Sequence, residues 1–238
     1  MNKGRRALGA LACMLSLTVH ADPVRVLTED DPPFNLREAG GQIGGVATDM
    51  VRDIFQRARL PYTLELLPWA RAYNLALTEA DVCLYATTRN AEREKRFLWI
   101  GPLLVNAWAI YAGPHSPDRV RTLDDVRPPA VIGGYLGDAV AQYLVDRGYR
   151  VQQINDDARN VQLLALGRID YWASGVYHAN YLLAKSPQTA IHPVLQFNVT
   201  DLYLACNPQL PGTAFARLRQ AFSAMQRDGT LDRIRHHD

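Results

Sequence analysis

The feature that most constrains the fold is an alternation of strand-like and helix-like segments that runs through the chain twice. An alternating strand at 24–28 precedes apolar residues that recur at helical spacing from Val46 to Ala58. The same alternation begins again at 130–134, after an extended apolar segment at 105–113 and a proline-rich stretch. Strands that alternate with helices predict an α/β fold with largely parallel sheets. Because the pattern is doubled, we expect two α/β lobes.

The first 21 residues have the features of a cleaved secretory signal. Three basic residues precede an apolar run at 7–19, and small residues at 19 and 21 precede Asp22. The run is too short to span a bilayer, and no later segment approaches about 20 apolar residues. We therefore expect residues 1–21 to be removed and the remainder to be periplasmic, with lipoprotein anchoring through Cys13 as the alternative.

The charge of the chain does not indicate a nucleic-acid partner. The sequence has 26 Lys and Arg residues against 24 Asp and Glu residues, a net charge of +2. Three of the basic residues lie in 1–21, so the remainder has 23 basic against 24 acidic residues, a net charge of −1. A chain without a basic excess has no general attraction for a polyanion. We therefore expect no nucleic-acid partner.

Two cysteines remain outside the signal segment. Cys83 and Cys206 both lie in apolar, strand-like runs. Export to an oxidising compartment permits a disulfide between them. Two buried free thiols are the alternative, because cysteine is tolerated in a core as a small apolar residue. The sequence leaves both alternatives open.

The sequence contains no motif that would identify an enzyme. It lacks the serine nucleophile elbow, the phosphate-binding loop, the dinucleotide-binding glycine pattern and the zinc-protease helix motif. Its cysteines and histidines are scattered and do not have the spacing of zinc ligands. We therefore expect a protein that is not an enzyme and that needs no metal or cofactor.

Seven short segments resemble, in order, those of a known family. The sequence is similar to the periplasmic solute-binding proteins of the polar amino-acid uptake type, family 3, over essentially all of the chain after residue 21. Each segment alone is a weak signal, and their shared order makes the resemblance specific. The segments are PPF (32–34), GGVATDMVRDIF (44–55), PWARAY (68–73), ADVCLYATTRNAERE (80–94), WIGPL (99–103), LGRID (166–170) and MQRDGTLDRI (225–234).

The resemblance implies a fold that agrees with the doubled pattern. Proteins of this family have two α/β lobes joined by two extended hinge strands, with a ligand cleft between the lobes. We expect residues 22–107 together with 198–238 to form the first lobe, and residues 108–197 to form the second. Ligand contacts from both lobes would favour the closed state over the open one.

The resemblance also implies roles for residues of the first lobe. Arg93 matches the family arginine that binds a ligand carboxylate, for which the planar guanidinium is well suited. Thr88 matches the hydroxyl residue that helps to hold this carboxylate, and Trp69 matches an aromatic that packs on the ligand. The alternatives are a solvated surface charge for Arg93 and a plain core position for Trp69. Arg71 is expected either near the cleft or paired with an acid.

Further candidates lie in loops near the expected cleft. Gly137 and Asp138 open a predicted helix, whose free N–H groups would suit an anionic group of the ligand. Asp31 follows the first strand. Asp31 and Asp138 are expected either to contact the ligand or to act as turn and cap residues.

One departure from the family concerns the ligand's amine. Amino-acid binders of this type usually have an aspartate just after the segment that matches LGRID, where it pairs with the ligand ammonium. Ser174 and Gly175 stand there in this chain, and we expect Ser174 to be among the ligand-binding residues. Because a buried ammonium without a counter-charge is costly, either Asp31 or Asp138 replaces this aspartate, or the ligand is not an ordinary α-amino acid.

We expect the chain to be a monomer that captures a small polar solute bearing a carboxylate and passes it to an inner-membrane ABC permease. One alternative is a sensor protein whose closed form engages a signalling receptor. Another is dehydratase or lyase chemistry on the same fold, for which Glu29, Asp31 and His178 are the candidate acids or bases.

Overall fold

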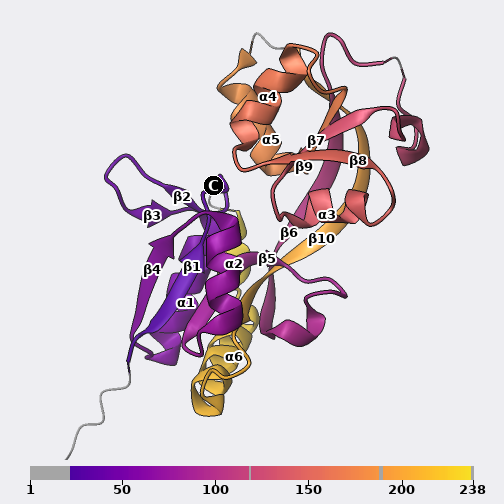
Figure 1. The fold of residues 1–238 in the computed structure, drawn as a ribbon. Coiled ribbons are helices and arrows are strands. Elements are labelled where there is room, and N and C mark those ends of the chain that lie inside the picture. Colours follow the sequence, from indigo (N-terminus) through magenta and orange to yellow (C-terminus); the bar gives the residue numbers. More distant parts are fainter. Residues whose placement is uncertain (1–21, 118, 188–189, 237–238) are drawn as a thin grey trace, which may run out of the picture.

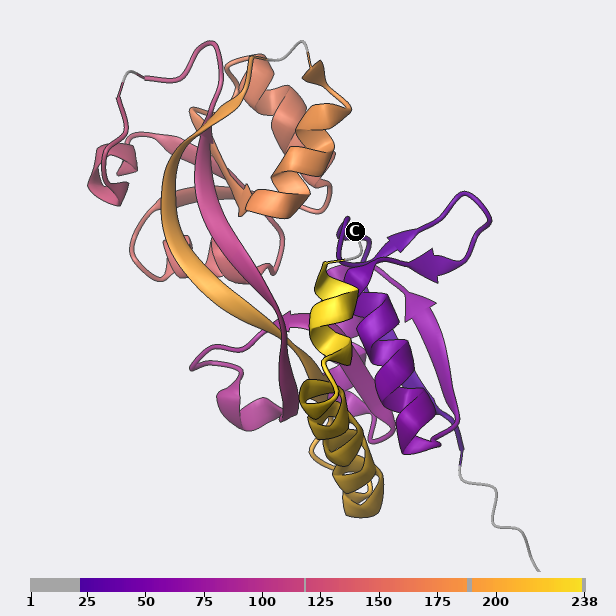
Figure 2. The ribbon, with the colours of Figure 1, turned by 180° about the vertical axis from the view of Figure 1, so that it is seen from behind.

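Two lobes are joined by a pair of long strands that run side by side from one lobe to the other (Figures 1 and 2). The computed structural model describes residues 22–117, 119–187 and 190–236, so the expected signal segment lies outside the described residues. The joining strands are β6 (Leu98–Ala112) and β10 (His192–Cys206). They pair antiparallel at the centre of an eight-stranded sheet with the order β4-β1-β5-β10-β6-β9-β7-β8.

The first lobe contains one end of this sheet and the helices that cover it. β1 pairs in parallel with β4 and β5, and β5 pairs antiparallel with β10. Its strands are β1 (Val24–Thr28), β4 (Tyr62–Leu66) and β5 (Val82–Thr88), with a small hairpin of β2 (Leu36–Arg37) and β3 (Ile43–Gly44). Its helices are α1 (Val46–Ala58), α2 (Trp69–Thr78), α6 (Gly212–Arg227), α7 (Thr230–Arg235) and the 3₁₀ turn η1 (Glu94–Arg96).

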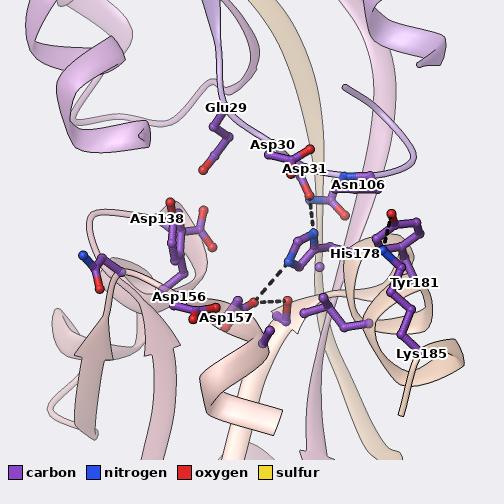
Figure 3. Close-up of a pocket in the computed structure, with 17 residues that line it drawn as sticks. Glu29, Asp30, Asp31, Asn106, Asp138, Asp156, Asp157, His178, Tyr181 and Lys185 are labelled. Atoms are coloured by element: carbon purple, nitrogen blue, oxygen red, sulfur yellow. Dashed lines mark hydrogen bonds and ion pairs between the residues drawn. The ribbon is translucent and has the colours of Figure 1, made fainter. Parts of the chain in front are cut away.

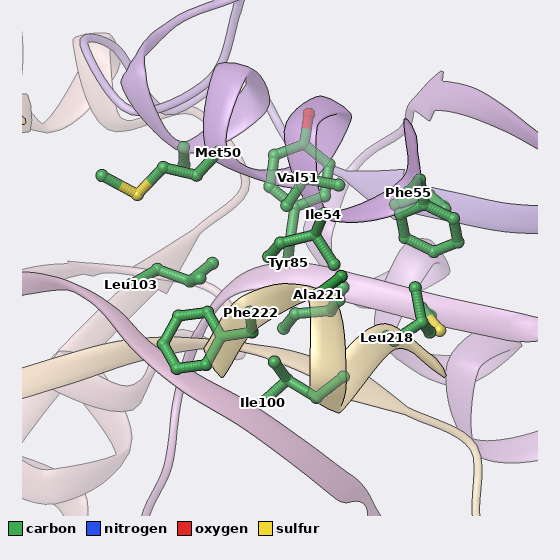
Figure 4. Packing of buried hydrophobic residues seen from close by; sticks show 14 of the residues in the cluster. Met50, Val51, Ile54, Phe55, Tyr85, Ile100, Leu103, Leu218, Ala221 and Phe222 are labelled. Atoms are coloured by element: carbon green, nitrogen blue, oxygen red, sulfur yellow. The ribbon is translucent and has the colours of Figure 1, made fainter. Parts of the chain in front are cut away.

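The core of the first lobe lies between the sheet and the two helices α1 and α6 (Figure 4). Met50, Ile54 and Phe55 of α1 recur at helical spacing, so they form one buried face of that helix. Phe222 of α6 and Leu103 of β6 are buried in the same cluster. α1 ends at Ala58 because the next residue, Arg59, takes the left-handed conformation that commonly terminates a helix.

The second lobe contains the other end of the sheet. β7 pairs in parallel with β8 and β9, and β9 pairs antiparallel with β6. Its strands are β7 (Val131–Tyr135), β8 (Arg150–Ile154) and β9 (Tyr171–Gly175). Its helices are α3 (Ala139–Val145), α4 (Asp157–Ala165), α5 (Val176–Ala184) and the 3₁₀ turn η2 (Leu123–Val126).

The predicted two-lobed α/β fold with two connecting strands is confirmed. Val105 and Val199, near the middle of β6 and β10, are 55% and 54% exposed, so neither lobe covers the strand pair there. The lobe boundaries predicted at 107 and 198 fall within these two strands and stay a prediction. Among the described residues, no helix has the length and apolar character that crossing a bilayer requires.

A disulfide joins Cys83 of β5 to Cys206 of β10. It decides between the two alternatives that the sequence left open, and the free-thiol alternative is wrong. The two residues are register partners on neighbouring antiparallel strands, and both are fully buried in the core of the first lobe. The bond closes a loop with a sequence separation of 123 residues, which includes the whole second lobe.

Replacing both cysteines by alanine is expected to lower the free energy of unfolding by about 2–5 kcal/mol, because the unfolded chain loses a constraint on a long loop. Urea unfolding followed by circular dichroism measures this change. A reductant should destabilise the wild type toward the level of the double variant and leave the variant unchanged. Equal stability of the two proteins without reductant would contradict the expected effect.

Candidate ligand-binding site

A cavity of about 400 Å³ lies between the two lobes (Figure 3). Its wall comes from the segments that follow β1, β7 and β8, from the end of β9, and from one face of α5. The carboxyl ends of parallel strands meet at one edge of a sheet, where ligands of α/β proteins are commonly bound. In this protein the carboxyl-end edges of the parallel strands in both lobes face the cavity. Residues far apart in sequence therefore line one wall.

The wall of the cavity is strongly acidic. Among the residues that line it, the basic ones are His178 and Lys185. Lys185 is exposed, and its Nζ donates to the hydroxyl of Tyr181 over 2.5 Å. Six carboxylates line the same space: Glu29, Asp30, Asp31, Asp138, Asp156 and Asp157.

His178 connects carboxylates of the two lobes. Its Nδ1 lies 2.8 Å from Oδ1 of Asp31 in the first lobe, and its Nε2 lies 3.6 Å from Oδ2 of Asp157 in the second. Burial opposes protonation of the imidazole, but Asp31, Asp157 and Glu29 outweigh it and raise the pKa of His178 to about 9. His178 therefore carries a positive charge at neutral pH and compensates part of the acidic wall.

Asp157 is held in place by neutral donors. Its Oδ1 accepts hydrogen bonds from Nε1 of Trp172 and Nδ2 of Asn160, both over 2.8 Å, and its Oδ2 accepts one from Oγ of Ser174 over 3.1 Å. Burial raises the pKa of Asp157, while His178 and these hydrogen bonds oppose the rise. Ser174, expected at the ligand amine, thus orients a buried carboxylate on the cavity wall.

Glu29 and Asp138 point toward one another from opposite lobes (Figure 3). Burial raises the pKa of Glu29 well above its usual range, and the charges of Asp31 and Asp138 add to the effect. Burial also raises the pKa of Asp138 to about 6, with Arg93 opposing the rise and Asp31 contributing to it. Among the described residues neither carboxyl group has a salt bridge, although the Tyr135 side chain bonds to Glu29 and Arg93 acts on Asp138 at longer range. They are therefore a poorly compensated acidic pair.

A second group of residues lies between the lobes but outside the cavity wall. We call Trp69, Tyr73, Thr88, Arg93 and Gly137 the Arg93 cluster. The guanidinium of Arg93 donates from Nη1 to the Thr88 carbonyl over 3.4 Å and from Nη2 to the Gly137 carbonyl over 3.2 Å. It also lies 5.2 Å from the ring centre of Trp69 and 5.0 Å from that of Tyr73.

The predicted ligand-binding residues thus fall into three groups. Asp31, Asp138 and Ser174 line the cavity. Trp69, Thr88, Arg93 and Gly137 belong to the Arg93 cluster. Arg71 is exposed on α2 and acts at longer range on Glu65, whose pKa is lowered chiefly by Arg25 and also by Arg71.

Two expectations need correction. The alternative that Arg93 is a solvated surface charge is wrong, because its side chain is buried. The N–H of Gly137, expected to be free for an anionic ligand group, donates to Oε1 of Gln153 over 3.2 Å. In the described part of the chain, no group of three or more His, Cys, Asp or Glu side chains is arranged to hold a metal ion.

The raised pKa of His178 makes the stability of the fold depend on pH. A histidine in the unfolded chain titrates near 6.5, so its stabilising contribution is full below that pH and is lost as pH rises through about 9. We expect the free energy of unfolding to fall by on the order of 3 kcal/mol between pH 6.5 and 9.5. Urea unfolding at steps of pH measures this change.

His178→Asn provides the control for this pH dependence. The variant lacks the titrating group, so its free energy of unfolding should change less over the same range. An equal slope in the wild type and the variant would show that His178 is not the group responsible.

Comparisons with known proteins agree with this architecture. The model of the bacterial extracellular solute-binding proteins, family 3, matches residues 24–237. A histidine kinase sensor domain similar to periplasmic binding proteins aligns with a TM-score of 0.82 and 20% identity, covering 90% of this chain and 94% of the other. No curated protein sequence matches the chain.

Two ancestral binding proteins have the same fold. One is an arginine-binding protein bound to arginine, with a TM-score of 0.76 and 20% identity over 89% of this chain and 96% of the other. The second is an amino acid-binding precursor of cyclohexadienyl dehydratase, with a TM-score of 0.74 and 19% identity over 89% and 92%. At such low identity these similarities show the fold and do not identify a ligand.

Proposed function

The chain belongs to the bacterial extracellular solute-binding proteins of family 3, and we propose that it captures a small solute with a positively charged nitrogen in the cavity between its lobes. The observation that carries the proposal is the acidic wall, in which six carboxylates face two basic side chains. Both a basic amino acid and a small amine carry such a nitrogen.

The most favourable position for the cationic group is between Glu29 and Asp138. Glu29 and Asp138 are half-buried and have raised pKa values, and an opposite charge close by would lower these pKa values and favour the ionised form. A ligand ammonium or guanidinium there would compensate the pair directly. These two acids would then replace the family aspartate that is absent at Ser174 and Gly175.

Closure of the lobes would follow because both lobes contribute ligand contacts. Glu29 and Asp31 belong to the first lobe, whereas Asp138 and Asp157 belong to the second. A ligand that touches both sets gains all its contacts only in the closed arrangement, so binding shifts the population toward closure.

The proposed setting is transport. We place the protein in the periplasm after removal of residues 1–21, acting as a monomer that delivers its solute to an inner-membrane ABC permease. A substrate binding protein of an amino acid ABC transporter has the same fold, with a TM-score of 0.75 at 16% identity. Loss of solute uptake when the gene is deleted would support import, and unchanged uptake would favour a sensor.

An enzyme on this fold is the remaining alternative. Glu29, Asp31 and His178, the candidate acids and bases, do lie on one cavity wall. However, the imidazole of His178 is paired with two carboxylates, and its raised pKa makes it a poor base at neutral pH. Product analysis after incubation with candidate solutes separates the classes, because a binding protein returns its ligand unchanged.

Glu29→Gln tests the proposed site of the cation. The change keeps the shape of the side chain and removes its ability to ionise beside a bound cation, so affinity for a cationic solute should fall about ten- to hundredfold. Isothermal titration calorimetry with lysine, arginine and cadaverine as probes measures the change. Glu92→Gln is the matched control, because Glu92 is an exposed acid of the same lobe. Equal losses in the two variants would contradict the assignment.

Asp138 makes binding depend on pH. Its pKa of about 6 in the free protein should fall when a cation binds, so affinity should rise as pH increases from 5 to 7. Binding below pH 6 should also release protons. Calorimetry in two buffers of different ionisation enthalpy measures that release, and its absence at pH 5.5 would count against contact between Asp138 and the cation.

A further inference from the structure

The Arg93 cluster connects the two lobes through hydrogen bonds. The carbonyl of Gly137, in the second lobe, accepts hydrogen bonds from Nε1 of Trp69 over 2.9 Å and from Nη2 of Arg93 over 3.2 Å, both from the first lobe. Gly137 has a φ of 77°, a conformation that favours glycine. A Cβ at this residue would also lie 3.3 Å from Cδ1 of Trp69. Backbone conformation and the lack of a side chain together allow this close contact.

The contacts of Arg93 leave its guanidinium engaged with protein groups. The residue is 5% exposed, its guanidinium donates to two backbone carbonyls, and it makes cation–π contacts with two aromatic rings. Arg93 is not among the residues that line the cavity. In this arrangement the guanidinium links the two lobes, and its charge acts on the cavity through Asp138, whose pKa it lowers.

The cavity wall itself is unsuited to a carboxylate. Of its two basic side chains, His178 is paired with Asp31 and Asp157, and Lys185 bonds to Tyr181. A carboxylate placed there would meet like charges in a partly desolvated space, which is unfavourable.

A separate observation points to a ligand that donates hydrogen bonds. Oδ1 of Asn106, on the same wall, is buried with no hydrogen-bond partner among the described residues. A buried acceptor without a partner is destabilising, and an N–H group of a ligand would satisfy it. Asn106 is 9% exposed and lies on β6, outside the acidic loops.

The cavity wall also contains apolar surface alongside its carboxylates. Pro32, Tyr181 and Leu182 line the cavity together with the carboxylates. Six carboxylates against two basic groups leave an excess of acidic groups that one positive charge would not balance. A methylene chain on the apolar surface, with a cationic nitrogen at each end, matches both features.

Building on the proposed function, we infer that the ligand is a small amine with two or more cationic nitrogens and no carboxylate, and that Arg93 joins the lobes instead of binding the ligand. The amine would be held by acids of both lobes, with one nitrogen between Glu29 and Asp138. Arg93 and Trp69 would hold the second lobe in the closed position through the Gly137 carbonyl.

Matched pairs of solutes that differ only by a carboxylate test the ligand class. Calorimetry compares cadaverine with lysine and agmatine with arginine on the wild-type protein. We expect the amines to bind at least tenfold more tightly than the corresponding amino acids. Tighter binding of the amino acids would overturn the inference and leave the proposed function standing. Failure of all four cations to bind would overturn both.

Arg93→Gln tests whether Arg93 connects the lobes or binds a ligand carboxylate. If Arg93 acts only between the lobes, the variant should lose affinity for lysine and cadaverine by the same factor. A larger loss for lysine would show that Arg93 holds a carboxylate and would overturn this part of the inference. Arg93→Lys keeps the charge but removes the planar donor pair, so it allows the same comparison of lysine with cadaverine if Arg93→Gln does not fold.

Discussion

The antiparallel pairing of β6 with β10 is the interaction on which the rest of the structure depends. These two strands belong to the sheet of both lobes, so their pairing determines which edges of the lobes face each other. The segments that follow β1 in the first lobe and β7 and β8 in the second then line the same cavity. The acidic wall is thus a consequence of topology, because neither lobe alone would bring Glu29 to Asp138.

The charges within the cavity are only partly balanced by the protein. His178 lowers the pKa of Glu29 and Asp157, yet burial leaves both with raised pKa values, and for Glu29 the charges of Asp31 and Asp138 add to the rise. If the lobes close on a ligand as proposed, repulsion between acids of opposite lobes would oppose closure of the empty protein, whereas the His178–Asp31 pair and the Arg93 cluster would favour it. A cation that binds between these acids would attract both of them, so the repulsion between the lobes would be replaced by attraction. This gives a physical reason for closure to depend on the charge of the ligand.

The fold was predictable from the sequence because its signals are local: the spacing of apolar residues in α1 and the alternation in β1. The disulfide and the strand order depend on pairing between distant segments. The spacing of residues along the sequence does not predict such pairing. The site was predictable only in part. Asp31 and Asp138 were expected near the cleft, but Asp157 stands at the start of a helix, where an acid is readily explained as a cap. The resemblance to the family pointed to Arg93 as a ligand contact, and the packing of its guanidinium between the lobes could be seen only in three dimensions.

If the charge of the cavity selects a cationic solute, a thermal-shift screen with solutes of graded charge should reveal that selection. Ligands that bind the native state raise the melting temperature by mass action. We expect a rise with amines and basic amino acids, and none with dicarboxylic acids at the same concentration and ionic strength. A rise with dicarboxylic acids and none with any cation would contradict it.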